Sequence, residues 1–110
     1  MNFPVEEKQG CLVVRLHGEV DMSRSPAARK VILKCLKKKR NVMVDLSAVD
    51  YIDSSGVASL VEGFQYARCN GLEFALAGVS EAAMNVLRLA RLDQVFTIRA
   101  TPDECPEAGS

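Results

Sequence analysis

The sequence predicts a single α/β domain built around a mixed β-sheet of about five strands. Its 110 residues match the common size of one domain. Short apolar runs of strand type alternate with longer stretches in which apolar residues recur at helical spacing. The order along the chain is therefore β-β-α-β-α-β-α-β, and a helix after each strand from the second onward implies right-handed crossovers between parallel neighbours.

The chain begins with a predicted β-hairpin. We expect a first strand over about residues 4–8 and a second strand over residues 11–17, joined by a turn at Gln9-Gly10 and ended by Gly18. The second run, Cys-Leu-Val-Val-Arg-Leu-His, has the apolar and β-branched composition that strands favour.

The first helix is predicted to begin at Ser25-Pro26. Ser25 is a good N-cap, and Pro26 suits the first helical position because its missing N–H would have no partner there. The helix is expected to end in the lysine cluster near Lys39. Its apolar stripe consists of Ala27, Val31, Ile32, Cys35 and Leu36.

The middle of the chain predicts a buried strand and a second amphipathic helix. Residues 41–46 are a short apolar run between two helical stretches, as in the buried strands of α/β sheets. Ser54 or Ser55 is expected to cap the next helix, and Asn70-Gly71 to end it in a left-handed conformation. The apolar face of this helix comprises Val57, Leu60, Val61 and Phe64.

The last third of the chain predicts one more helix between two strands. Residues 72–77 form a strand that Gly78 stops, and a final short strand covers residues 95–99. Ser80 opens the intervening helix as its cap. We expect the domain to span residues 1–100, followed by a loose acidic tail over residues 101–110.

The charges of the chain are balanced but unevenly placed. Basic and acidic residues number 14 each, whereas a dedicated nucleic-acid binder usually has a basic excess. A basic run without acidic residues lies between Met22 and Val44: Arg24, Arg29, Lys30, Lys34, Lys37, Lys38, Lys39 and Arg40. We interpret it as the solvated face and C-terminal end of the first helix, and binding of nucleic acid or an anionic membrane is the alternative.

The sequence predicts a cytoplasmic protein with no metal centre and no membrane span. The four cysteines are isolated from one another without C-x-x-C spacing, so they are expected to be ordinary thiols. The N-terminal residues lack the apolar stretch of a signal peptide, and no apolar run approaches the roughly 20 residues that span a bilayer.

The segment Asp53-Ser54-Ser55-Gly56 is the candidate functional site. It joins a strand to a helix N-terminus, where free N–H groups and the helix dipole favour a phosphate. Gly56 is expected to leave room for the backbone of another molecule. The alternative is purely structural, because Ser and Asp are also the best N-caps.

The ordered set of motifs resembles the STAS domain of the anti-sigma-factor antagonist family. The resemblance covers about residues 11–99. It rests on Gly18-Glu19-Val20-Asp21, Val42-Met43-Val44-Asp45-Leu46-Ser47, Tyr51-Ile52-Asp53-Ser54-Ser55-Gly56-Val57, residues 71–80 and Leu92-Asp93-Gln94-Val95-Phe96. It implies a STAS-like domain with its helices mainly on one face of the sheet.

The resemblance also implies a partner-switching function. A serine kinase that is itself an anti-sigma factor, with a histidine-kinase-like ATPase fold, would phosphorylate Ser54. The unphosphorylated chain would bind this kinase and release the sigma factor, and a PP2C-type phosphatase would reset the switch. Asp53 would position the hydroxyl, and Ser55 and Gly56 would shape the helix start. The expected partner-binding residues are Asp21, Met22, Ser54, Ser55 and Val57.

The sequence departs from the family pattern in two places. The tail carries two prolines, so the usual last helix is short or absent, and the open flank of the sheet could bind a second copy as a homodimer. Met22 stands where several relatives carry a polar residue. A STAS accessory subunit or sensory module that regulates a membrane transport ATPase, or another signalling protein, is therefore the alternative function.

Two other classes of protein, enzymes and aspartyl-phosphate receivers, fit the sequence poorly. An enzyme is not expected, because His17 is the only histidine and neither a nucleophile-elbow nor a P-loop motif is present. No cofactor is implied. Asp45 ends a buried strand like the acceptor of an aspartyl-phosphate receiver, but residues 3–13 contain no adjacent Asp pair followed by a helix.

Overall fold

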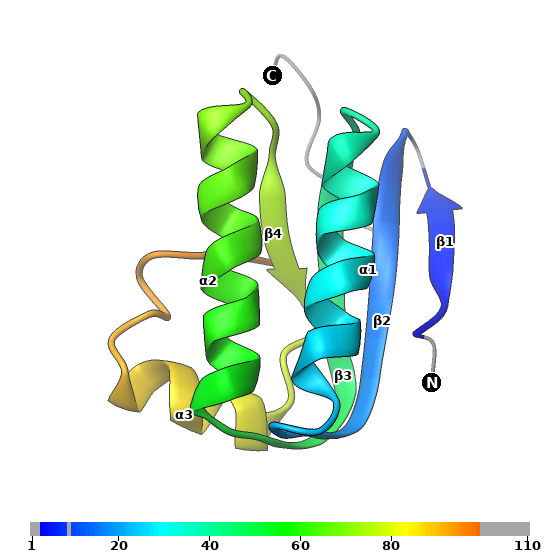
Figure 1. Cartoon of the computed structure of the whole chain (residues 1–110). Coiled ribbons are helices and arrows are strands. Elements are labelled where there is room, and N and C mark those ends of the chain that lie inside the picture. Colours follow the sequence, from blue (N-terminus) through cyan, green and yellow to red (C-terminus); the bar gives the residue numbers. More distant parts are fainter. Residues whose placement is uncertain (1–2, 9, 100–110) are drawn as a thin grey trace.

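Five strands pair in the order in which they occur along the chain (Figure 1). The structure is a computed structural model that describes residues 3–8 and 10–99. The strands are β1 (Val5–Lys8), β2 (Cys11–Val20), β3 (Asn41–Ile52), β4 (Phe74–Ala77) and β5 (Thr97–Arg99). β1 pairs antiparallel with β2, and every other pair is parallel. The predicted mixed five-stranded sheet is confirmed.

Three helices connect the parallel strands. They are α1 (Ser25–Lys37), α2 (Ser54–Cys69) and α3 (Glu81–Leu89). In Figure 1, α1 and α2 lie side by side in front of the sheet, and the short α3 lies at its lower end. The predicted element order and the placement of the helices mainly on one face are confirmed.

The main core lies between the sheet and the helices. Alternate residues of β2, β3 and β4 face the helices because successive side chains of a strand point to opposite faces. Fully or almost fully buried members of this core include Leu16, Val44 and Leu76 from the strands and Ile32 and Leu60 from the helices. A smaller buried cluster lies on the opposite face of the sheet: Cys11, Val13, Met43, Ala75 and Ala77.

Two strands are longer than predicted, and this difference shapes the candidate site. β2 continues past Gly18 to Val20, and β3 continues past Leu46 to Ile52. The extensions pair with each other across two register shifts, and Gly18 adopts φ +70 beside one of them. A glycine here permits an irregular ladder instead of ending the strand. The two parallel strands thus end level, with Val20 opposite Ile52.

The helix ends test several predictions from local sequence. Ser80 caps α3 by accepting a hydrogen bond from the N–H of Ala83, and Gly71 ends α2 at φ +69, as predicted. Ser25 does not cap α1: it is the first helical residue, and its N–H donates to the carbonyl of Asp21. That prediction was wrong because Asp21 already begins the turn that leads into the helix.

Among the described residues, one cysteine differs from the prediction. Cys35 and Cys69 are free, but Cys11 is disulfide-bonded, so the expectation of four ordinary thiols was wrong. In the part of the chain that the structure describes, no helix is long and apolar enough to span a membrane. The predicted acidic tail, residues 101–110, lies outside the described residues.

Candidate functional site

The level ends of β2 and β3 bring two loops together at one edge of the sheet. The loop after β2 begins at Asp21, and the loop after β3 is the single residue Asp53 before α2. A hydrogen bond of 3.3 Å from the N–H of Asp53 to the carbonyl of Val20 joins them. The site thus forms at the carboxyl ends of parallel strands, where ligands and partners of α/β sheets usually bind.

Asp53 is the N-cap of α2. Its Oδ1 accepts hydrogen bonds from the N–H groups of Ser55 at 2.9 Å and Gly56 at 3.2 Å, and from the Ser55 hydroxyl at 2.6 Å. The prediction that Ser54 or Ser55 caps this helix was therefore wrong. The extended backbone of Asp53 places its carboxylate over the first free N–H groups, and both serines already lie in the helix.

Ser54 is the first residue of α2, and its side chain is exposed. Its hydroxyl has no hydrogen-bond partner among the described residues, because the Asp53 carboxylate holds the neighbouring Ser55 hydroxyl instead. An unpaired hydroxyl at a helix N-terminus is accessible to another protein. The positive end of the helix dipole would favour a negative group added there.

The loop after β2 repeats the same local geometry. Asp21 Oδ1 accepts hydrogen bonds from the N–H of Ser23 at 3.0 Å and from the Ser23 hydroxyl at 2.6 Å. The residue between them, Met22, is 77% exposed. Ser23 was missed in the sequence, although the shared Asp-x-Ser spacing of Asp21 and Asp53 was a visible signal.

Both carboxylates are held in their charged form. The hydrogen bond from the Ser55 hydroxyl is the main cause that lowers the pKa of Asp53, and N–H groups of Gly56 and Ser55 add to it. The pKa of Asp21 is lowered in the same way, mainly by the Ser23 hydroxyl. Asp21 also acts on Asp53, whose pKa it raises by charge repulsion. Two negative groups therefore flank Ser54 near neutral pH.

Gly56 and Val57 are buried, not exposed to a partner. A Cβ at Gly56 would lie 2.6 Å from Ile52 Cγ1 and 2.7 Å from the Val20 carbonyl oxygen. The expectation that Gly56 leaves room for another molecule was wrong, because the chain's own β2 and β3 fill that space. Val57 is 7% exposed and belongs to the core. Of the five residues predicted to contact a partner, Met22 and Ser54 are the exposed ones.

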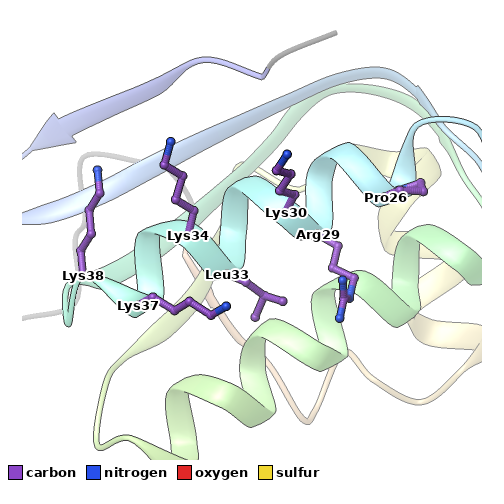
Figure 2. A pocket seen from close by; sticks show the side chains of 7 residues that line it. All are labelled: Pro26, Arg29, Lys30, Leu33, Lys34, Lys37 and Lys38. Carbon is purple, nitrogen blue, oxygen red and sulfur yellow. The ribbon is translucent and has the colours of Figure 1, made fainter.

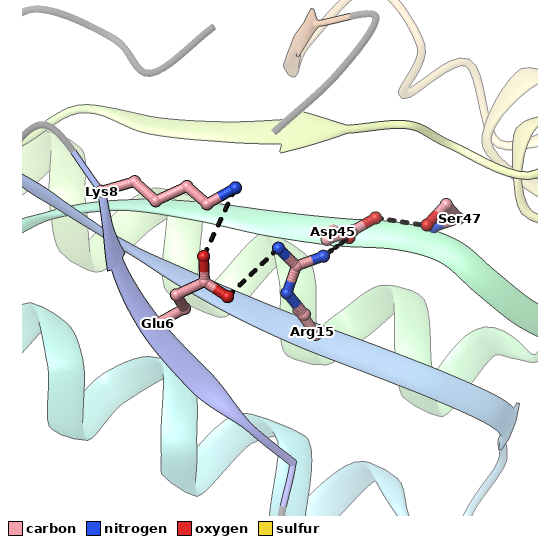
Figure 3. Close-up of polar contacts among 5 residues, drawn as sticks. All are labelled: Glu6, Lys8, Arg15, Asp45 and Ser47. Carbon is pink, nitrogen blue, oxygen red and sulfur yellow. Dashed lines mark hydrogen bonds and ion pairs between the residues drawn. The ribbon is translucent and has the colours of Figure 1, made fainter. Parts of the chain in front are cut away.

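The other candidate residues have structural partners. His17 is half-buried and packs edge-on against Phe3. Asp45 is 3% exposed, and its carboxylate accepts hydrogen bonds from Arg15 at 2.7 Å and from the N–H of Ser47 at 2.9 Å (Figure 3). This occupied carboxylate argues against a phosphate acceptor at Asp45. Among the described residues, no group of His, Cys, Asp or Glu side chains could hold a metal ion.

Comparison with known proteins identifies the domain. A family profile for the STAS domain matches residues 2–105. The chain belongs to the STAS domain family. An anti-sigma-B factor antagonist of Bacillus subtilis is 23% identical over 100 residues, which cover 91% of this chain and 92% of that protein.

Solved STAS structures have the same fold. An anti-sigma factor antagonist from Mycobacterium paratuberculosis matches with a TM-score of 0.81 and 27% identity, over 94% of this chain and 88% of that one. The Bacillus cell fate determinant SpoIIAA, solved in its phosphorylated form, matches with a TM-score of 0.73 and 21% identity, over 93% and 94% of the two chains. The STAS fold predicted from the sequence motifs is thus confirmed.

Proposed function

We propose that this chain is an anti-sigma-factor antagonist whose affinity for its partner is set by phosphorylation of Ser54. The observation that carries the proposal is the exposed Ser54 hydroxyl at the start of α2, which has no partner among the described residues and lies beside a second serine whose hydroxyl is already bonded to Asp53. Two relatives named above are anti-sigma factor antagonists, and one protein of this fold has been solved in a phosphorylated form. These facts support the proposal.

The partner is a serine kinase that is also an anti-sigma factor, with a histidine-kinase-like ATPase domain. The unphosphorylated chain binds it through the loops at the ends of β2 and β3, and thereby frees the sigma factor. A phosphate on Ser54 adds about −1.5 to −2 charges beside Asp53 and Asp21. The added charge is tolerated at the helix start, but it is unpaired in an interface shaped for a neutral hydroxyl.

The chain itself performs no catalysis in this scheme. The kinase supplies ATP, magnesium and the base that accepts the hydroxyl proton. A PP2C-type phosphatase removes the phosphate. The exchange takes place in the cytoplasm, where a sigma factor acts. Sedimentation of the chain alone would show whether it also forms a homodimer.

The decisive experiment is phosphorylation by the cognate kinase with magnesium and ATP. We expect one phosphate, which mass spectrometry maps to Ser54. Ser54→Ala should abolish the modification and Ser55→Ala should preserve it, and the reverse pattern would overturn the assignment. Ser54→Asp should weaken kinase binding by at least about tenfold, or ~1.4 kcal/mol, in calorimetry.

Co-purification separates this function from the transport hypothesis. Retention of a histidine-kinase-like ATPase by wild type, and its loss with Ser54→Asp, is the expected result. Retention of an ABC-type transport ATPase instead would support an accessory subunit of a transporter.

A further inference from the structure

The outer face of α1 carries a concentration of positive charge that the Ser54 site does not use. A hollow of about 540 Å³ lies on this face. Figure 2 shows the lining side chains along both sides of α1: Pro26, Arg29, Lys30, Leu33, Lys34, Lys37 and Lys38. We define these seven residues as the α1 basic groove.

The lysines of the groove form a regular row. Lys30, Lys34 and Lys38 are spaced four residues apart and point to the same side of the helix in Figure 2. Residues four apart rise by about 6 Å along a helix axis, so their ammonium groups repeat at this interval. Alternate side chains of an extended peptide repeat at about 6.6–6.8 Å, which is close to the same spacing.

The cations of this row have no counter-charge among the described residues. Lys30, Lys34, Lys37 and Lys38 are exposed, and none forms an ion pair with another described residue. Arg29 is paired with Glu62 of α2 at one end of the groove, so a carboxylate already binds to this surface. The lysines in the remainder of the groove can bind carboxylates of a second molecule in the same way.

Leu33 adds an apolar surface to one side of the groove. Leu33 is partly exposed, points to the same side of α1 as Lys37 and Arg29 in Figure 2, and packs against the core. An extended occupant with a carboxylate at every second residue would direct all of these carboxylates toward the lysine row. The ammonium group of lysine is a compact charge on a flexible side chain, so it pairs with carboxylates without requiring a fixed geometry.

We propose that the α1 basic groove binds an acidic, extended segment of a partner protein, at a site separate from Ser54. A membrane fits less well, because no large hydrophobic residue of α1 is exposed for insertion. Duplex nucleic acid fits less well, because the whole chain has zero net charge and would be repelled outside this one helix.

Fluorescence anisotropy with a labelled peptide of alternating Asp and Leu residues tests this proposal at low salt. Wild type should bind the peptide, and the triple variant K30E/K34E/K38E should bind at least about tenfold more weakly. The matched control is R68E/R88E/R91E, which makes the same change in net charge at exposed arginines outside the groove. It should bind within about twofold of wild type, and circular dichroism should show both variants folded.

Three results would overturn the proposal. The first is no binding of the peptide by wild type, and the second is an equal loss in the two triple variants. The third is stronger lysine-dependent binding to vesicles of phosphatidylcholine and phosphatidylserine, or to a DNA duplex, than to the peptide. Ser54→Asp should leave peptide affinity unchanged, so failure of the groove and failure of the phosphorylation switch are distinguishable.

Discussion

Asp21 and Asp53 end neighbouring parallel strands and make the same turn. Each Oδ1 accepts hydrogen bonds from the backbone N–H and the hydroxyl of the serine two residues later. The residues between, Met22 and Ser54, are exposed. The paired turns therefore hold one exposed apolar side chain and one exposed hydroxyl at the same edge of the sheet.

This geometry predicts different costs for removing the two serine hydroxyls of α2. Ser54→Ala should change the free energy of unfolding by less than about 0.5 kcal/mol, because it removes an exposed hydroxyl without a partner among the described residues. Ser55→Ala should lower it by about 1 kcal/mol, because the lost hydroxyl donates to Asp53. Urea denaturation measures both values. A larger cost for Ser54→Ala would contradict the assignment of the cap.

The same hydrogen bond predicts the pH dependence of stability. The pKa of Asp53 is lower in the folded chain than in the unfolded one, so its charged form stabilises the fold above the unfolded value of about 4. This contribution is lost as the pH falls through the folded pKa. Ser55→Ala should raise the pKa of Asp53 and reduce the loss of stability in acid. Carboxyl titration by NMR checks this, with Ser54→Ala as the control that leaves the titration unchanged.

Charge repulsion between the two loops adds a second test by the same titration. Asp21 raises the pKa of Asp53, so Asp21→Asn should lower it further. An unchanged pKa of Asp53 in Asp21→Asn would show that there is no electrostatic interaction between the two loops.

The element order was predictable because several local signals agreed. The apolar face of α2, the left-handed Gly71 and the Ser80 cap each depend on residues close in sequence. Such features form wherever propensity, patterning and turn chemistry agree. These local signals are sufficient to predict that Ser54 lies at a helix start.

The strand ends and the caps were not predictable from local patterns. Gly18 is typical of a strand end, yet cross-strand pairing carries β2 past it to Val20. Asp53, Ser54 and Ser55 are all good caps, and only the backbone path out of β3 selects Asp53. Burial of Gly56 against Val20 likewise depends on how α2 packs over two strands. These features are tertiary, so the exposure of individual site residues could not be inferred.

The close approach at Gly56 predicts that a single methyl group disturbs the site. Gly56→Ala should lower the free energy of unfolding by about 1–3 kcal/mol, because the Cβ overlaps Ile52 Cγ1 and the Val20 carbonyl oxygen. It should also shift the NMR signals of Asp21 and Ser54 and slow phosphorylation.

Gly71→Ala is the matched control for this change. A Cβ at Gly71 meets no atom within 4 Å, so its cost of about 1 kcal/mol comes from the left-handed backbone alone. It should leave the rate of phosphorylation unchanged. Equal slowing by the two substitutions would show that general destabilisation, not displacement of α2, is responsible.

The ion pair on the face of the sheet opposite α1 and α2 predicts a cost that depends on burial. Asp45 is almost fully buried and pairs with Arg15, which also contacts the more exposed Glu6 (Figure 3). Arg15→Met should lower the free energy of unfolding by about 1–3 kcal/mol, because it leaves a buried carboxylate short of a partner. Glu6→Gln should cost less than about 1 kcal/mol, since that pair is solvated.

A double-mutant cycle in urea separates this pairing from general packing. In the background of Asp45→Asn the buried group is neutral and still accepts from the Ser47 N–H, so Arg15→Met should cost less there by about 0.5 kcal/mol or more. Additive costs would mean that Arg15 contributes only through the packing of its stem. A coupling energy of the expected sign would show that the ion pair between Arg15 on β2 and Asp45 on β3 stabilises the fold.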